Sequence, residues 1–214
     1  MSNLSKRFAT SIILFIILYY AIINQIVLFI LLIVLSYFLL IELFYLKKKI
    51  LYKNNKAVLI FNLISIIYIS FFFTQIYLFI IFDLENKILF LYLLSICIAT
   101  DIGGFICGKT FKGKKLTKIS PNKTYSGLIG SYLFALIVFI FFYYKLNYSL
   151  DFVILTLIIS TISQLGDLFI SLLKRLAKVK DTGNLLPGHG GILDRIDGIL
   201  FALPIGINLL LFFK

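Results

Sequence analysis

Long apolar stretches separated by short polar segments run along the whole chain. The first, Phe8–Leu46, has one acidic and no basic residue in 39 positions. It is long enough for two membrane-spanning helices of about 20 residues each, and we expect the break between them near Asn24-Gln25. Further spans are predicted at 57–82, 88–108, 125–144, 152–173 and 194–213. The pattern predicts an all-α, polytopic integral membrane protein with about seven transmembrane helices.

The composition agrees with this interpretation. Of the 214 residues, 61% are hydrophobic and 14% are charged, whereas a soluble domain carries about 25% charged residues. No linker is long enough to separate two domains. We therefore expect one continuous membrane domain, with N-terminal transmembrane helices in 1–100 and most of the candidate chemistry in 101–214. Two polar cytoplasmic loops, 109–123 and 174–193, belong to the second part.

Basic residues gather on one side of the predicted spans. Eighteen of the 21 lysines and arginines precede the first span or follow the second, fourth and sixth. Basic loops stay in the cytoplasm, so we expect the N-terminus there. The net charge of +12 then records orientation, and we expect no nucleic-acid partner because no basic and aromatic surface lies outside these loops. Lys6-Arg7 and the apolar run after them resemble a signal peptide, but the run continues too long, so we expect an uncleaved first helix.

Two aspartates interrupt the apolar spans. Asp101 and Asp167 each lie about seven residues, or roughly 10 Å, before the cytoplasmic end of a predicted helix. A carboxylate at that depth costs at least about 2.5 kcal/mol unless it is paired, hydrated or bound to a cation. Pairing with a lysine for packing alone is the structural alternative. We favour a functional site.

Polar side chains recur at steps of three and four along the sixth predicted helix and so share one face of it: Gln164, Asp167, Ser171 and Lys174. Asp194 and Asp197 share a face at the start of the seventh helix. Together with Asp101, these carboxylates are expected at a similar depth, close to a group of basic residues: Lys174, Arg175, Lys180 and Arg195. Oxygen ligands suit Mg²⁺, and Mg²⁺ with basic residues suits a polyphosphate. The set predicts phosphoryl or nucleotidyl transfer at the membrane surface.

Three short segments have the composition of anion-binding loops. His189 lies in a turn with three glycines and a proline, whose amides could face an anion; a purely structural turn is the alternative. Ser120–Thr124 precedes the fifth helix, where it either caps that helix or presents its N-terminus to phosphate. Gly103–Thr110 matches a P-loop pattern, but a membrane helix precedes it where a strand is required, so we reject that interpretation.

A longer pattern resembles a known family. Ser171-x-x-Lys174-Arg175, Lys180-Asp181 and Pro187-x-His189-Gly190-Gly191-x-x-Asp194-Arg195-x-Asp197 resemble the signature of the phosphatidate cytidylyltransferases, or CDP-diacylglycerol synthases. Two upstream segments match as well: Gln164-x-Gly166-Asp167-Leu168 and Ser120-Pro121-x-Lys123-Thr124-x-x-Gly127. The resemblance covers about residues 101–200, whereas the first hundred match only as apolar spans.

The resemblance implies transfer of CMP from CTP to phosphatidic acid, giving CDP-diacylglycerol and pyrophosphate. It places the enzyme in the bacterial cytoplasmic (inner) membrane with its active site facing the cytoplasm, and makes 101–214 the catalytic region. Mg²⁺ is implied, with a second cation left open. By position, the catalytic residues are Asp167, Lys174, Arg175, Asp194, Arg195 and Asp197, of which Asp167, Asp194 and Asp197 are the metal ligands. The substrate-binding residues are Asp101, Ser120, Lys123, Thr124, Ser171, Lys180, Asp181, His189, Gly190 and Gly191.

Two departures and two alternatives accompany the resemblance. Ser126 stands where the family usually has an acidic residue, and the N-terminal part is shorter than in typical members, which is expected to narrow the lipid pocket or change dimer contacts. Whether the chain forms a homodimer stays open. One alternative is another CTP-using lipid enzyme, such as a polyprenol kinase, which would release CDP in place of pyrophosphate. The other is a cation-coupled transporter, which would place its carboxylates near the bilayer midplane.

Overall fold

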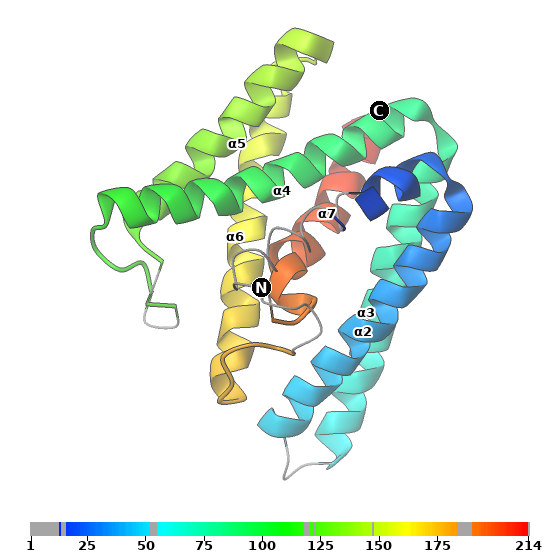
Figure 1. Cartoon of the computed structure of the whole chain (residues 1–214), viewed down its shortest axis with the longest axis vertical. Coiled ribbons are helices and arrows are strands. Elements are labelled where there is room, and N and C mark those ends of the chain that lie inside the picture. The colour runs from blue at the N-terminus through cyan, green and yellow to red at the C-terminus, as the bar shows by residue number, and fades with distance from the viewer. Residues whose placement is uncertain are drawn as a thin grey trace. The chain divides into compact units, whose positions relative to one another are not determined.

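The computed structural model describes residues 13, 16–51, 55–117, 120–121, 123–146, 148–183 and 190–213. Within these ranges the chain is almost entirely helical, and an isolated β-bridge pairs Lys115 with Thr124. The helices with defined bounds are α2 (Gln25–Ile50), α3 (Asn55–Phe82), α4 (Leu84–Phe111), α5 (Tyr125–Leu146), α6 (Phe152–Leu176) and α7 (Leu193–Phe213) (Figure 1). The all-α prediction is confirmed.

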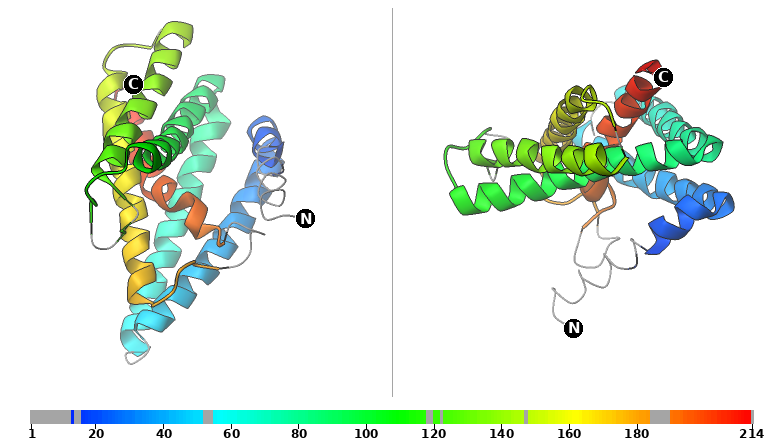
Figure 2. Two further views of the ribbon diagram at one scale, coloured as in Figure 1. Left: turned by 60° about the vertical axis from the view of Figure 1, so that its left-hand side comes forward. Right: turned by 90° about the horizontal axis from the view of Figure 1, so that it is seen from above.

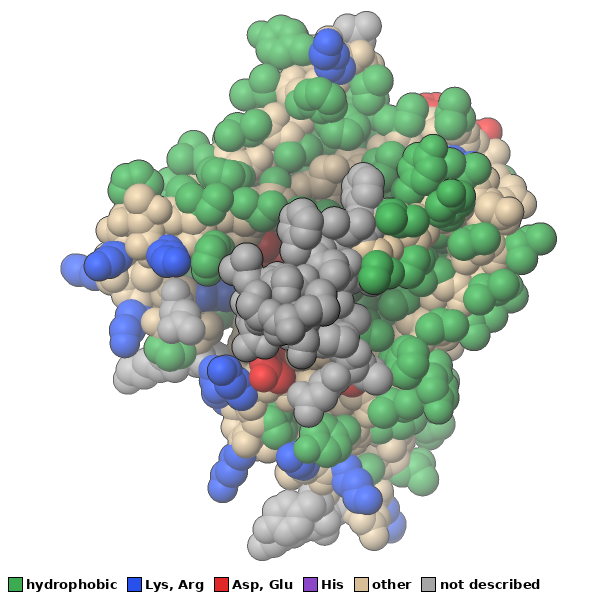
Figure 3. Space-filling view, viewed as in Figure 1, with side chains coloured by type: hydrophobic (Ala, Val, Ile, Leu, Met, Phe, Trp, Pro, Cys, Tyr) green, Lys and Arg blue, Asp and Glu red, His purple; other side chains and the backbone are tan. Residues whose placement is uncertain are grey.

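All six of these helices are long and apolar enough to cross a membrane. A helix can cross a membrane because its backbone N–H and C=O groups bond to one another, and lipid offers them no hydrogen-bond partners. Hydrophobic side chains are spread over much of the described surface seen in Figure 3. The chain is therefore a multi-pass membrane protein. The first predicted span begins outside the described residues, and 16–23 are helical.

Asn24 separates that first helical segment from α2, as the sequence predicts. Its backbone is extended, and its side-chain oxygen accepts hydrogen bonds from the amides of Ile26 and Val27, at 2.9 and 3.3 Å. An asparagine in this position is a favourable N-cap. The boundary between α3 and α4 differs from the prediction, since α4 already begins at Leu84. Polar residues 85–87 form its first turn, where Glu85 interacts favourably with the helix dipole.

The described helices fall into two compact units, each treated on its own below. Unit 1 consists of Met1–Asp83 and Leu173–Ile196, and unit 2 of Leu84–Leu172 and Asp197–Lys214. Helices α6 and α7 each contribute residues to both units. The division at residue 100 that the sequence suggests stays a prediction.

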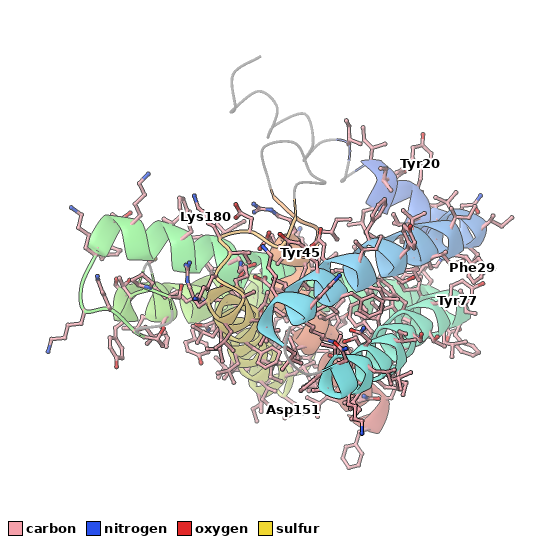
Figure 4. All side chains as sticks on the ribbon, turned by 90° about the horizontal axis from the view of Figure 1, so that it is seen from below. Tyr20, Phe29, Tyr45, Tyr77, Asp151 and Lys180 are labelled. Atoms are coloured by element: carbon pink, nitrogen blue, oxygen red, sulfur yellow. The ribbon has the colours of Figure 1, made fainter. Side chains whose placement is uncertain are left out.

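In unit 1, α2 and α3 pack against each other. Phe29 of α2 and Tyr77 of α3 meet edge to face with ring centroids 5.5 Å apart (Figure 4). Toward the other end of the pair, the Lys47 ammonium donates a hydrogen bond of 2.7 Å to the carbonyl of Phe61. The aromatic and polar contacts together hold this helical hairpin along its length.

In unit 2, α4 and α5 converge toward the loop that joins them (Figures 1 and 2). Small residues make the close approach possible, because a side chain at Gly104 would lie 2.7 Å from the Ser131 hydroxyl and one at Gly127 would lie 2.8 Å from the Gly104 carbonyl. Hydrogen bonds cross between helices here too: Ser131 donates to the carbonyl of Thr100 at 2.8 Å, and Thr100 to Ser160 of α6 at 3.0 Å. This packing forms the floor of a polar pocket.

Candidate functional site

A pocket of about 290 Å³ in unit 2 contains several of the residues singled out from the sequence. It is formed by α4, α5, α6 and the segment before α5. Its polar lining includes Asp101, Ser120, Lys123, Thr124, Gln164 and Asp167. The structure thus brings together two carboxylates, a lysine and two hydroxyl-bearing residues from three separate stretches of sequence.

Asp167 and Lys123 form an ion pair in this pocket. The Lys123 ammonium lies 2.5 Å from Oδ2 of Asp167, and both side chains keep about a quarter of their surface accessible, 24% and 28%. The Ser171 hydroxyl donates to Oδ1 of the same carboxylate at 3.3 Å, as expected for residues four apart on one helical face. An ion pair this exposed contributes only about 0–1 kcal/mol to stability. Lys123 and Asp167 can therefore each give up this ion pair and bind a ligand at little cost in stability.

The segment before α5 acts as a helix cap. The Thr124 side-chain oxygen accepts a hydrogen bond of 3.1 Å from the amide of Gly127, which is the arrangement of an N-cap threonine. The amides of Tyr125 and Leu128 bond to the carbonyls of Lys114 and Thr124. Of the two roles considered for this segment, capping is the one with observed contacts. The positive charge directed at the pocket comes from Lys123.

Ser126, where an acidic residue is usual in the family that the sequence resembles, has a local role. Its hydroxyl donates to the carbonyl of Lys112 and lies 2.9 Å from the Thr124 hydroxyl. Gly113, which follows Lys112, has φ of +114°, a conformation that favours glycine. Ser126 therefore fastens the loop between α4 and α5 to the start of α5.

A second Lys–Asp pair lies in unit 1. It belongs to residues 174–195 of the pattern that resembles the phosphatidate cytidylyltransferases, called the signature segment below. The Lys174 ammonium donates to Oδ1 of Asp194 at 2.7 Å. Oδ2 accepts from the amides of Thr182 and Gly191, at 2.8 and 3.1 Å, and lies 3.0 Å from the Thr182 hydroxyl. The Asp194 side chain is only 6% exposed. Three N–H donors and the Thr182 hydroxyl therefore surround this carboxylate, whose side chain is nearly closed off from solvent.

Gly190 and Gly191 fit closely around this second pair. Gly190 has φ of +84°, and a side chain there would lie 3.0 Å from Oδ2 of Asp194. Arg175, Lys180, Asp181 and Arg195, also in unit 1, are exposed. His189, with Pro187 and Gly188, lies outside the described residues, so its predicted role stays a prediction.

Asp197 belongs to unit 2, on α7. It is 7% exposed, and its Oδ1 accepts a hydrogen bond of 2.8 Å from the amide of Gly198. Helix α7 passes close to α6 here, because a side chain at Gly166 would lie 2.9 Å from the Asp197 carbonyl oxygen. Asp197 thus lies next to the turn of α6 that carries Asp167, although it is not among the residues that line the pocket.

Sequence reasoning missed Glu42 and Thr182. Glu42 lies on α2 and is 3% exposed. Its Oε1 accepts from the amide of Ile192 at 2.9 Å, and its Oε2 accepts from the amide of Leu193 at 2.9 Å and the Thr182 hydroxyl at 2.6 Å. A signal was present, since Glu42 is the single acidic residue of the apolar stretch Phe8–Leu46 and a carboxylate in such a stretch demands partners.

The donor chemistry of the unit 2 pocket fits a hard cation. Asp101 and Asp167 offer carboxylate oxygens, and Ser120 and Thr124 offer hydroxyl oxygens, which are the ligand types that Mg²⁺ prefers. Within the described residues, no group of three or more histidine, cysteine, aspartate or glutamate side chains is arranged around a common point. The set Asp167, Asp194 and Asp197 therefore stays a prediction from the sequence.

Comparison with known proteins agrees with the sequence resemblance. A model of the cytidylyltransferase family matches residues 3–213. The chain belongs to this family. Similar curated members are the phosphatidate cytidylyltransferases of Rickettsia typhi, 41% identical over 139 residues, Bacillus subtilis, 43% over 120, and Staphylococcus aureus strain COL, 46% over 125.

These matches cover a limited part of each protein. They include 59%, 54% and 56% of this chain, and 61%, 45% and 48% of the respective relatives. The chain thus matches about half to three fifths of the length of these cytidylyltransferases. The comparison shows the family, and it makes the activity named for the relatives the first candidate here.

Proposed function

We propose that this chain catalyses the transfer of CMP from CTP to phosphatidic acid, giving CDP-diacylglycerol and pyrophosphate. The observation that carries the proposal is the unit 2 pocket, where Asp101, Asp167 and Lys123 meet. Carboxylates that could bind a cation, beside an accessible ammonium, suit a nucleoside triphosphate. Membership of the cytidylyltransferase family and the names of the bacterial relatives support the same reaction.

In this reaction, a phosphate oxygen of phosphatidic acid attacks the α-phosphorus of CTP. The new bond joins the two phosphates, and the bond from the α-phosphorus to the bridging oxygen of the β-phosphate breaks, so that pyrophosphate leaves. The nucleophile is already an anion and needs no strong general base. Positioning of the two phosphates and neutralisation of their charge supply most of the rate.

The Lys123 ammonium is the group in the pocket that would neutralise phosphate charge. Its present partner, Asp167, is held by an accessible ion pair, which a triphosphate and its counter-cation can replace at low cost. Asp167 would then be free to bind Mg²⁺, and Gln164, Ser120 and Thr124 on the pocket wall would orient the substrate. Mg²⁺ would neutralise the phosphate oxygens when bound. Chelation of divalent cations should abolish transfer, and added Mg²⁺ should restore it.

The apolar helices support a reaction at a lipid bilayer, which would hold phosphatidic acid. We propose that the pocket opens to the cytoplasm of a bacterial inner membrane. The distribution of basic residues along the sequence supports this orientation, because the loop that carries Lys123 is one of the basic loops. CTP, a cytoplasmic metabolite, would reach the pocket from that side.

The test uses the full chain purified in detergent with phosphatidic acid, α-labelled CTP and Mg²⁺. We expect label in the lipid phase and an equal amount of pyrophosphate. Release of CDP without labelled lipid would replace the proposal by a CTP-dependent lipid kinase, and absence of both products would refute nucleotidyl transfer. Lys145→Ala, an exposed change at the far end of α5, is the control and should leave the rate unchanged.

A further inference from the structure

We propose that Glu42 is a positioning residue, which acts through Thr182 to hold the Asp194–Lys174 pair in its working geometry. The inference rests on the proposed function, because it assigns a purpose to residues of the signature segment. It concerns contacts within unit 1 alone. The residue lies on α2, outside the stretch 101–200 that carries the family-like sequence pattern.

The first argument is the number and kind of donors around Glu42. Both carboxylate oxygens accept a backbone N–H, from Ile192 and Leu193 at 2.9 Å each, and Oε2 also accepts the Thr182 hydroxyl at 2.6 Å. The side chain is 3% exposed. A buried carboxylate without such donors would be strongly destabilising. Three donors directed at one carboxylate indicate a specific binding arrangement for Glu42, and burial of the side chain alone would not produce it.

The second argument is what those donors belong to. Leu193 is the first residue of α7, and Asp194 and Arg195 follow in its first turn. The opening amides of a helix lack partners within the helix, and a carboxylate satisfies them and interacts well with the helix dipole. Glu42 therefore caps α7 from a distant part of the chain, which fixes the position and rotation of the turn that carries Asp194.

The third argument is the continuous connection from Glu42 to the Lys174 ammonium. The Thr182 hydroxyl has one proton and lies between two carboxylates, 2.6 Å from Oε2 of Glu42 and 3.0 Å from Oδ2 of Asp194. The Thr182 amide also bonds to Asp194 at 2.8 Å, and Asp194 bonds to Lys174 at 2.7 Å. Glu42, Thr182 and Asp194 each make at least two of these contacts, so a change at Glu42 displaces Thr182 and then Asp194.

The fourth argument is that glycines make room for Glu42. A side chain at Gly183 would lie 2.8 Å from Oε1 of Glu42, and one at Gly191 would overlap both the Glu42 carboxylate and the Thr182 hydroxyl. Gly191 belongs to the family-like signature, whereas Glu42 does not. The glycine at 191 is thus required by a residue of α2, in addition to any contact with substrate.

The test compares Glu42→Gln, Glu42→Asp and Thr182→Val in the full chain. The contacts of Glu42 with Thr182, Ile192 and Leu193 are called the Glu42 clamp below. Glutamine keeps the size of the side chain, but its NH₂ group must face the N–H of either Ile192 or Leu193, so one contact of the clamp is lost. Turnover is expressed per CTP-binding site, which removes misfolded molecules from the comparison. We expect Glu42→Gln to lower this turnover about 100-fold, the effect of a displacement near 1 Å. Glu42→Asp keeps both acceptor oxygens on a side chain one methylene shorter, and should recover part of the loss.

Two further measurements make the outcome decisive. Thr182→Val should cause a similar loss, and the double variant with Glu42→Gln should add little, because the two residues act in one chain. Amide exchange at Ile192 and Leu193 should be slow in the wild type and faster in Glu42→Gln. The matched control is Glu85→Gln, an exposed glutamate in the first turn of α4, which should change nothing.

If Glu42→Gln lowers total activity only as much as it lowers the number of CTP-binding sites, the positioning role is overturned and a structural role is left. Additive losses in the double variant, or a Glu42→Gln protein with normal turnover, would also overturn it. Failure of the proposed function looks different: the wild type itself would transfer no CMP. Because amide exchange needs no substrate, it reports on the Glu42 clamp in that case too, and unprotected amides at 192 and 193 would reject the clamp.

Discussion

The protein contains two Lys–Asp pairs of similar length in very different surroundings. Lys123 and Asp167 meet in a pocket of unit 2, where about a quarter of each side chain is accessible and Asp167 has one further hydrogen bond, from Ser171. Lys174 and Asp194 meet in unit 1, where Asp194 is almost fully covered and two backbone amides and a hydroxyl also surround it. The same two residue types therefore provide an exchangeable pair in one place and a fixed one in the other.

This difference in accessibility suggests a ligand-binding role for one pair and a structural role for the other. An accessible ion pair contributes little to stability and is open to substitution by a ligand. Breaking a buried pair by removing one partner is strongly destabilising, because a charge stays behind without compensation. The open pair is thus suited to meet a substrate, and the closed pair to hold a segment in place. Three substitutions test this contrast.

Asp194→Asn should have the largest effect, on both stability and turnover. It removes the partner of Lys174 and one acceptor for the surrounding amides, so we expect the free energy of unfolding to fall by about 3 kcal/mol. The measurement is thermal unfolding in detergent, with turnover in parallel. A variant as stable as the wild type would show that the closed pair does not hold the segment.

Asp167→Asn should lower turnover by about 100- to 1000-fold, the usual cost of losing one charge-stabilising group in an active site. Its unfolding temperature should stay close to that of the wild type, because the pair it breaks is accessible. Steady-state kinetics and thermal unfolding of the same preparation provide both values. A large loss of stability with little loss of turnover would reverse the roles of the two pairs.

Lys123→Gln should have the smallest effect, because Mg²⁺ would still neutralise phosphate charge in the transition state and the loss then falls mainly on substrate affinity. Loss of one charged contact to phosphate is worth about 1.5–3 kcal/mol, so we expect KM for CTP to rise roughly 10- to 100-fold. CTP titrations at saturating phosphatidic acid measure the change. An unchanged KM would place the triphosphate elsewhere.

The same contrast shows how far sequence reasoning reaches. Apolar runs predicted the helices, because spanning a bilayer sets both their length and their composition, and the Asn24 cap marked a break within one of them. The pocket residues Asp101 and Asp167 were predicted because carboxylates are conspicuous within apolar runs, and Lys123 was predicted from the family resemblance. The start of the span predicted at 88–108 was wrong, because α4 begins at Leu84 and polar residues also suit the first turn of a helix.

The Glu42 clamp was missed for a different physical reason. Its partners, Thr182, Ile192 and Leu193, are 140, 150 and 151 residues away in sequence, and two of the three donors are backbone amides, which every residue possesses. Local spacing cannot reveal such a pairing. The solitary carboxylate showed that partners were needed, and only the three-dimensional structure shows which they are.

The long separation within this clamp has a consequence for biosynthesis. At about 5–20 residues per second, a ribosome makes Thr182 roughly 7–30 s after Glu42. During that interval α2 enters the membrane with a carboxylate whose eventual donors do not yet exist. The neighbouring Lys47, Lys48 and Lys49 keep that end of the helix at the lipid–water boundary, where water can solvate the waiting side chain. Assembly of the signature segment is accordingly a late event in the life of the nascent chain, completed when α7 arrives.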